Sequence, residues 1–211
     1  MKNTVLINYL EAKEAVIRAG FSAELDWQED IRFSGVTESD FLREAAWVVL
    51  SSGMRESVIR NKFPEISNAF YSWESATRIN YNANSCRQKA LSSFSHKGKI
   101  DAIISIAREI HKITYQSFRN NIECQGIDFI QRFPYMGPAT SFHLAKNIGL
   151  DVVKPDRHLL RVAAAAGYDS PHSLCKEISE LCGDSISLVD IVIWRFATLN
   201  PRYQEVFSCY G

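Results

Sequence analysis

Apolar residues recur at helical intervals through most of the chain, and no stretch of useful length alternates apolar and polar residues as a β-strand does. Residues 1–20 form one such amphipathic pattern, which Gly20 ends. The pair Thr37 and Asp40 resembles a capping box and opens a second pattern that stops at residues 51–54. Further helical patterns cover residues 99–118 and two segments within 170–199. The sequence therefore predicts an all-α fold.

Two polar segments interrupt these patterns. Residues 21–35 hold Trp27 among several acidic residues and are predicted to form a loop or short turn. Residues 78–99 contain no acidic residue, and their centre, Asn80–Ser85, is polar and turn-like. Its five cations are Arg78, Arg87, Lys89, Lys97 and Lys99. This basic segment is interpreted either as a solvated loop beside a helix or as a strip that contacts a DNA backbone.

Residues 127–148 predict two helices joined by a tight turn. Ile127–Phe133 carries apolar side chains at near-helical spacing, and Pro134 cannot continue a helix because it lacks an N–H, so the first helix is expected to end near Phe133. Gly137 gives the turn backbone freedom, and Pro138 suits the first position of the second helix, which Gly149 stops.

Such a turn directs backbone N–H groups and a positive helix end toward one point, which suits a phosphate. The N–H groups of Met136, Gly137 and Ala139 are the expected donors. Pro138 has no N–H to give. The hydroxyls of Thr140 and Ser141 are expected to add further donors.

A lone carboxylate follows the second helix after a short loop. Asp156 stands where the N-cap of the next helix is expected, ahead of the apolar residues Leu159, Leu160 and Val162. One interpretation is that Asp156 only caps this helix. The other is that it also faces the sugar of a nucleotide whose phosphate the turn holds.

These two motifs resemble the helix-hairpin-helix DNA glycosylase superfamily, which includes endonuclease III, the adenine-mismatch glycosylases and the alkyladenine glycosylases. The family turn reads roughly Leu-Pro-Gly-Val-Gly-x-x-Thr-Ala, and this chain has Phe-Pro-Tyr-Met-Gly-Pro-Ala-Thr-Ser at 133–141. The second family motif, Val-Asp-x-His-x-x-Arg-Val, corresponds to residues 155–162. The resemblance extends over most of the chain, but only these two motifs are specific.

The resemblance implies two helical lobes, one of residues 37–148 and one of residues 1–36 plus 149–211, with the turn and Asp156 at the cleft between them. It also places a side chain that fills the gap left by a flipped base in the loop Ser51–Arg55, where Met54 and Arg55 are the candidates. The resemblance further implies that Arg157 contacts DNA. The residues expected to line a substrate pocket are Trp27, Trp47, Tyr135 and His158.

Several of these residues have a plain structural interpretation as well. Trp27 and Trp47 have the spacing of core residues. His158 and Arg161 both match the family motif, and each is interpreted either as structural or as contacting the substrate. In the structural interpretation Arg161 holds a carboxylate or backbone carbonyls.

Two positions depart from the family pattern. Strand-cutting members carry a Schiff-base Lys just before the hairpin Thr, where this chain has Ala139. The resemblance therefore implies a monofunctional enzyme that uses water as its nucleophile, with Lys146 and Lys154 as the nearest substitutes for that Lys. The second departure is Tyr135 in place of the first Gly of the turn, which requires an acceptable φ there.

Composition adds limits on partners and cofactors. The 211 residues carry no net charge at pH 7, with 46% hydrophobic and 23% charged residues, so DNA binding would need a local basic face. No apolar run approaches membrane-spanning length, and the N-terminus lacks a signal-peptide pattern, so a cytoplasmic, monomeric protein is expected, at the nucleoid if bacterial.

Five cysteines are present, at positions 86, 124, 175, 182 and 209. Cys175 and Cys182 reproduce the first interval of the iron–sulfur motif found in some family members, but Ser185 stands where the third ligand belongs. We therefore expect reduced thiols and no cluster, zinc or other cofactor.

The expected activity is hydrolysis of the N-glycosidic bond of a flipped base in double-stranded DNA, with Asp156 as the catalytic residue. The base is not readable from the sequence; candidates are an alkylated or oxidised purine, a mismatched base, or a bulky modified pyrimidine of phage DNA. Repair and phage defence are thus both open. The alternatives are a non-catalytic DNA-binding module and a helical protein-interaction scaffold.

Overall fold

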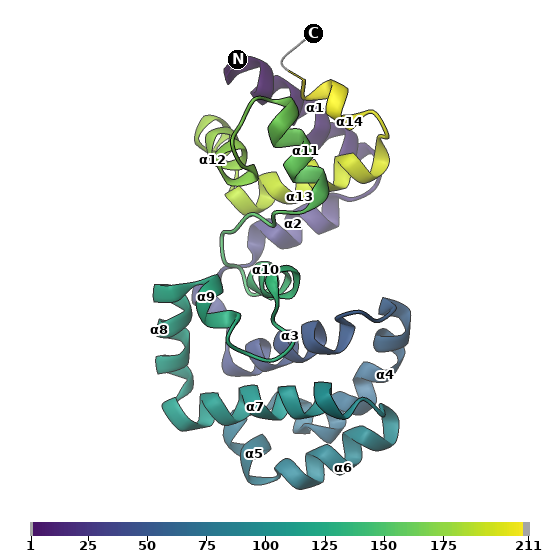
Figure 1. The fold of residues 1–211 in the computed structure, drawn as a ribbon, viewed down its shortest axis with the longest axis vertical. Helices are drawn as coiled ribbons and strands as arrows, with labels where there is room; N and C mark the ends of the chain where they lie inside the picture. The colour runs from purple at the N-terminus through teal and green to yellow at the C-terminus, as the bar shows by residue number, and fades with distance from the viewer. Residues whose placement is uncertain (1, 209–211) are drawn as a thin grey trace. The chain divides into compact units, whose positions relative to one another are not determined.

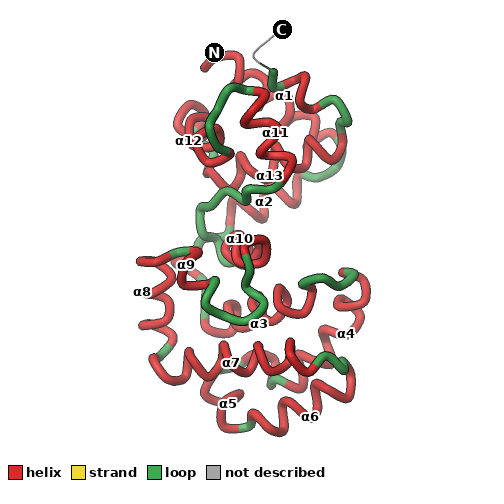
Figure 2. The backbone as a smooth tube through the Cα atoms, in the orientation of Figure 1, coloured by secondary structure: helices red, strands yellow, loops and turns green. Residues whose placement is uncertain are grey.

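The computed structural model describes residues 2–208, and helices joined by loops and turns, with no β-strand, make up this range (Figures 1 and 2). The all-α prediction is confirmed. The chain divides into two compact units. The segments up to Arg32 and from Gly149 onward form the terminal unit, and Phe33–Ile148 form the middle unit. The first division falls after Arg32, whereas the sequence places it after Val36.

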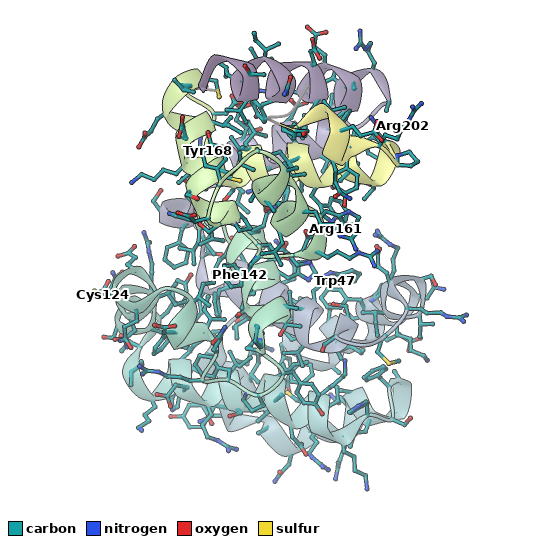
Figure 3. The ribbon with its side chains drawn as sticks, turned by 45° about the horizontal axis from the view of Figure 1, so that its top comes forward. Trp47, Cys124, Phe142, Arg161, Tyr168 and Arg202 are labelled. Carbon is teal, nitrogen blue, oxygen red and sulfur yellow. The ribbon has the colours of Figure 1, made fainter. Side chains whose placement is uncertain are left out.

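The terminal unit is organised around one apolar helix. It contains α1 (Lys2–Arg18), α2 (Ser22–Asp30), α11 (Arg157–Ala165), α12 (Pro171–Cys182), α13 (Ile186–Leu199) and α14 (Tyr203–Val206). Helix α13 packs against each of the other five. Its buried residues Leu188, Val192 and Ile193 are wholly removed from solvent and meet Tyr9 of α1 in the same core. Outside this core, Arg202 extends into solvent ahead of α14 (Figure 3).

The middle unit is built on α7. Its elements are η1 (Phe33–Gly35), α3 (Glu38–Ser51), α4 (Glu56–Ala69), η2 (Tyr71–Trp73), α5 (Ala76–Tyr81), α6 (Ala83–Ser93), α7 (Lys97–Ile113), α8 (Tyr115–Gln125), α9 (Ile127–Ile130) and α10 (Pro138–Asn147). Helix α7 contacts α3, α5, α6 and α8. Because Ile103, Ile106 and Ile110 share one face of α7 and are buried, this helix carries much of the unit's core.

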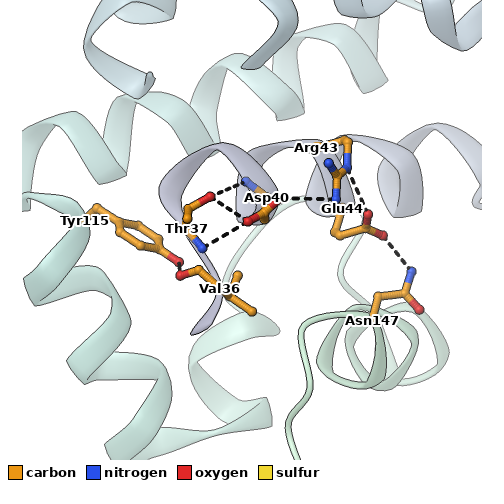
Figure 4. A network of polar contacts seen from close by, with 7 residues as sticks. All are labelled: Val36, Thr37, Asp40, Arg43, Glu44, Tyr115 and Asn147. Carbon is orange, nitrogen blue, oxygen red and sulfur yellow. Dashed lines mark hydrogen bonds and ion pairs between the residues drawn. The ribbon is translucent and has the colours of Figure 1, made fainter. Parts of the chain in front are cut away.

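Helix starts and stops agree with the sequence where local chemistry sets them. Thr37 and Asp40 form the predicted capping box of α3: the Thr37 hydroxyl accepts the Asp40 N–H, and the Asp40 carboxylate accepts the Thr37 N–H (Figure 4). Beside it, the Tyr115 hydroxyl donates to the Val36 carbonyl at 2.9 Å. Two contacts in this region therefore fix where α3 begins.

Three predictions about helix content are wrong. Residues 21–35 contain α2, whose buried face, Leu25 and Gln28, packs on α13. The polar segment Asn80–Ser85 lies within α5 and α6 apart from a turn at Asn82, because Ala76, Ile79, Cys86 and Ala90 are buried. The pattern over 99–118 breaks at Thr114, whose φ of +70° ends α7 and whose hydroxyl caps α8. Polar composition misled the first two predictions because tertiary packing overrides it.

No helix among residues 2–208 combines the length and apolar character needed to cross a lipid bilayer.

Candidate functional site

The hairpin turn, residues 131–137, begins earlier than the sequence suggests. Helix α9 ends at Ile130, one turn before the predicted end at Phe133. After it, Arg132 and Phe133 donate to carbonyls three residues back instead of four. Tyr135 then takes a left-handed φ of +66°, a conformation that is rare for residues other than glycine. The φ that the sequence analysis requires of Tyr135 is therefore a left-handed one.

A cluster of packed aromatic rings supports the turn. Phe118 of α8 is fully buried, and its ring lies 5.2 Å from that of Phe129 and 5.5 Å from that of Phe133, centroid to centroid. It also meets Phe41 of α3 edge-on at 5.0 Å. Offset and edge-on ring pairs of this kind are favourable beyond their burial. The turn therefore rests on three helices of the middle unit.

Three of the predicted phosphate donors are occupied inside the turn. The Met136 N–H donates to the Phe133 carbonyl at 3.1 Å. The Ser141 hydroxyl is fully buried, donates to the Pro138 carbonyl and accepts from Gln131. The Thr140 hydroxyl donates to the Tyr135 carbonyl at 2.6 Å. The predictions that Met136 and Ser141 donate to a ligand, and that the Thr140 hydroxyl does so, therefore disagree with this conformation.

The backbone N–H groups of Gly137, Ala139 and Thr140 remain. Among residues 2–208 none of the three has a hydrogen-bond acceptor, and the first intrahelical bond of α10 starts at Ser141. Pro138 occupies the first position of α10 as predicted. Gly137 and Ala139 are exposed. Three donors at a positive helix end are suited to an anion such as a phosphate.

A hollow of about 560 Å³, which we call the Trp47 hollow, adjoins the start of α10. Its lining comes from α3, the α3–α4 loop, α4 and α10, and consists of Trp47, Ser51, Ser52, Met54, Glu56, Arg60, Thr140 and His143. Its volume falls within the range of about 300–1,000 Å³ typical of ligand sites. The structure thus brings Trp47, Met54 and Thr140, three predicted site residues, to one place.

Trp47 is half-buried and held on one side. Its ring meets Phe63 edge-on at 5.2 Å, and the Arg60 guanidinium lies 5.8 Å from its centroid. Arg60 also forms an ion pair with Glu56 one turn earlier on α4. Met54, 39% exposed, and Arg55 stand in the loop that begins α4. Trp47 is therefore neither wholly a core residue nor freely exposed.

In the terminal unit, Asp156 caps α11 through one oxygen. Oδ1 accepts the N–H groups of His158 at 2.8 Å and Leu159 at 3.0 Å. The predicted N-cap is confirmed. Within residues 2–208, Oδ2 has no hydrogen-bond or ion-pair partner, and the side chain is half-buried. The carboxylate is thus fixed in position with one oxygen left for another interaction.

The other motif residues around Asp156 divide into two groups. His158 uses both ring nitrogens within the protein: Nδ1 pairs with the Tyr203 hydroxyl at 3.2 Å, and Nε2 accepts from Arg157 at 3.3 Å. Arg161, labelled in Figure 3, is instead exposed, and no carboxylate or carbonyl among residues 2–208 holds it. The structural interpretation of Arg161 is therefore not supported by any contact. Arg157 and Arg161, one turn apart, are two exposed cations of the helix that Asp156 caps.

Two predicted pocket residues lie elsewhere. Trp27 is 46% exposed on α2, so the interpretation of Trp27 as a core residue is wrong. Tyr135, 36% exposed, packs against the start of α7 rather than in the Trp47 hollow: its ring meets that of His96 at 5.9 Å. Neither side chain lines the hollow that Trp47 lines.

The basic segment 78–99 is largely neutralised by acidic residues just outside it. Arg78 pairs with Glu74, and Arg87 makes two hydrogen bonds to Asp101, at 2.5 and 3.0 Å. The bond from Arg87 holds the pKa of Asp101 below its ordinary value. Since Lys99 is buried, only Lys89 and Lys97 of the five cations stay exposed and without an ion pair among the described residues. Most of the positive charge that a DNA-contacting strip would need is therefore neutralised or buried.

Lys99 is the residue whose role the sequence analysis missed. Its side chain is 2% exposed, and its ammonium donates to three backbone carbonyls at the end of α3. Burial lowers the pKa of this amine. A signal was present: Lys99 lies four, seven and eleven residues before Ile103, Ile106 and Ile110, on the apolar face of α7.

Four of the five cysteines, Cys86, Cys124, Cys175 and Cys182, lie among the described residues and form no disulfide with one another, and Cys209 lies outside the described residues. Within residues 2–208 no three His, Cys, Asp or Glu side chains gather as metal ligands would.

Comparison of the chain with known protein families, with curated proteins and with solved structures finds no match.

Proposed function

We propose that this protein is a monofunctional DNA glycosylase, which removes a damaged or modified base from double-stranded DNA and leaves an abasic site. The observation that carries the proposal is the state of Asp156: one carboxylate oxygen is fixed by two backbone N–H groups, and the other has no partner among the described residues. A fixed carboxylate with a free oxygen is suited to a charge that develops on a substrate.

The hairpin turn supplies the second part of the proposal. The N–H groups of Gly137, Ala139 and Thr140 bind a backbone phosphate of the DNA, and this contact sets the register of the protein on the strand. Arg157 and Arg161 add exposed positive charge on α11, the helix that Asp156 caps. A chain with no net charge binds DNA through such local cations, and salt weakens the binding.

The chemistry is a hydrolysis. As the C1′–N bond of the flipped nucleotide breaks, the base leaves with the bonding electrons and the deoxyribose ring becomes positive. Ionised Asp156 stabilises that ring and orients or deprotonates the attacking water, whose oxygen forms the new bond to C1′. Ala139 has no amine for a Schiff base, so the strand stays uncut.

In this proposal the Trp47 hollow contacts the bases that are displaced when the target base leaves the stack. Met54 and Arg55 enter the stack where the base leaves, because an extruded base costs a few kcal/mol of stacking that a wedge side chain partly restores. The half-buried face of Trp47 offers a stacking surface within the same hollow. Altered purines, mismatched bases and bulky pyrimidines of phage DNA are the substrate classes. The enzyme acts as a monomer in the cytoplasm.

The test compares wild type, Asp156→Asn and Asp169→Asn on a panel of modified duplexes and phage genomic DNA. Asp169→Asn is the matched control, because it removes the same charge from an exposed site of the terminal unit. Free base and alkali-labile sites are measured, and borohydride trapping reports any Schiff base. We expect release by wild type and Asp169→Asn only, without trapping. Release by Asp156→Asn at the wild-type rate would reduce Asp156 to a helix cap.

A non-catalytic DNA-binding module is the second candidate. The observation that favours it is that the turn's three N–H donors stand on the middle unit alone, whereas Asp156 has the geometry of an ordinary N-cap. This candidate predicts salt-dependent DNA binding by wild type with no release of base across the panel.

A further inference from the structure

Lys99 stands at the meeting point of three elements of the middle unit. Its side chain is almost fully buried on the apolar face of α7. Lysine is rarely buried to this degree unless its ammonium has partners. The contacts of this ammonium therefore show which parts of the unit it holds.

All three hydrogens of the ammonium are used by the end of α3. Nζ lies 2.8 Å from the Val49 carbonyl oxygen, 2.7 Å from that of Leu50 and 2.5 Å from that of Ser52. The last carbonyls of a helix lack intrahelical donors, and a positive charge there is favourable. Lys99 thus fixes the point at which α3 passes into the loop carrying Met54 and Arg55.

The same ammonium faces the hairpin turn. Nζ lies 5.5 Å from the ring centroid of Tyr135, a cation–π contact. The preceding residue leaves room for that ring: a Cβ on Gly98 would stand 2.5 Å from the Tyr135 hydroxyl oxygen, closer than any real contact, but 3.6 Å from Cζ. Tyr135 is therefore fitted to α7, although its own φ is unfavourable.

We infer that Lys99 is a positioning residue that fixes the α3–α4 loop and the hairpin turn relative to each other, so that wedge residues and phosphate donors engage DNA together. The inference rests on the proposed function for the role of the two segments. The alternative is that Lys99 only caps α3. The two differ in whether loss of the ammonium disturbs the turn as well as the loop.

Hydrogen exchange without DNA distinguishes them directly. In Lys99→Met, which keeps an unbranched apolar side chain but removes the ammonium, we expect faster exchange of the hydrogen-bonded amides of Phe133 and Met136 in the turn as well as in residues 51–55. Lys97→Met is the matched control, since Lys97 is exposed on the same helix two residues earlier. Faster exchange confined to 51–55 would show a helix cap alone and overturn the inference.

A pair of variants tests the turn side without touching the ammonium. Gly98→Ala should displace Tyr135 and speed exchange in the turn, and adding Tyr135→Phe should restore it, because the oxygen that clashes is then absent. This pair also decides the question if Lys99→Met does not fold. The fit of Tyr135 to α7 would be refuted if Gly98→Ala left exchange in the turn unchanged. It would also be refuted if the double variant exchanged as fast as Gly98→Ala.

The functional readout uses a duplex that carries 2-aminopurine, whose fluorescence rises when it leaves the stack. Wild type and Lys112→Met, a variant at an exposed residue near the other end of α7, should bind the duplex and raise this fluorescence. Lys99→Met should bind it but give a rise about fivefold smaller, as expected for the loss of a contact worth about 1 kcal/mol. No binding by wild type would refute the proposed function and the inference with it. An equal rise in Lys99→Met would refute the inference alone.

Discussion

Asp156 allows the structural and the chemical roles of one carboxylate to be separated. Its Oδ1 accepts two N–H groups of α11, so Asp156→Ala leaves both without an acceptor. Loss of an N-cap acceptor costs about 1 kcal/mol, within a range of about 0.5–2 kcal/mol. Asn keeps an acceptor oxygen and is an equally good N-cap residue, so Asp156→Asn loses only the charge at the helix end, about 0.3–1 kcal/mol.

Urea and thermal unfolding at neutral pH and low salt measure both values. For a chain of this length, 1 kcal/mol corresponds to a shift in Tm of about 2–4 °C. Ser170→Ala is the control, because Ser170 caps α12 of the same unit with a bond of 3.1 Å from the Ser173 N–H. We expect Ser170→Ala and Asp156→Ala to be destabilised similarly, and Asp156→Asn less than either.

The stabilities of Asp156→Asn and Asp156→Ala decide how the activity assay is interpreted. If Asp156→Asn folds nearly as stably as wild type and releases no base, the lost rate belongs to the negative charge and not to α11. If Asp156→Asn is destabilised as strongly as Asp156→Ala, the reasoning from the cap geometry is wrong. An unchanged unfolding midpoint in Asp156→Ala would likewise show that the two N–H bonds contribute nothing to stability.

Three further predictions concern the middle unit. Phe118→Ala should destabilise it by about 3–5 kcal/mol, measured by urea unfolding, because the fully buried ring supports Phe41, Phe129 and Phe133; a loss below about 1 kcal/mol would mean that the cluster is not packed as described. Burial raises the pKa of Tyr115 from 10.0 to about 12, so its stabilising contribution is complete below pH 10 and is lost as the pH rises toward 12; Tyr115→Phe should lose about 1 kcal/mol with its bond to Val36 and show no such decline. The hydrogen bond from Thr37 lowers the pKa of Asp40 from 3.8, so this contribution is present above pH 3.8 and is lost as the pH falls through the lowered value; Asp40→Asn should flatten the acid limb of the stability curve, and an unaltered limb would contradict the assignment.

The sequence by itself determined where α3, α10 and α11 begin and the order of the motifs. The capping box Thr37–Asp40, Pro138 at the start of α10 and Asp156 at the start of α11 all occur where the pattern of residues predicts them. Each depends on hydrogen bonds or backbone angles within about three residues, so neighbouring side chains are enough to set them. The all-α class follows from the same local periodicity.

The helix predictions were wrong where polar composition and tertiary packing favour different structures. Residues 21–35 and 80–85 are predicted as loop or turn because they are polar, yet a few buried positions such as Leu25, Ile79 and Cys86 hold α2, α5 and α6 against neighbouring helices. Burial of a small apolar stripe stabilises a helix whose average composition is hydrophilic. No window of the sequence shows which neighbour covers that stripe.

Only the tertiary structure decided which groups are left for a ligand. It brings the Gln131 amide to the Ser141 hydroxyl ten residues later, pairs Arg87 with Asp101 fourteen residues away, and leaves the N–H groups of Gly137 and Ala139 without acceptors among the described residues. Lys99 shows the same point most clearly, since its partners lie 47 to 50 residues earlier in the chain. Whether a donor is spent or free depends on partners distant in sequence, and these become neighbours only when the helices pack.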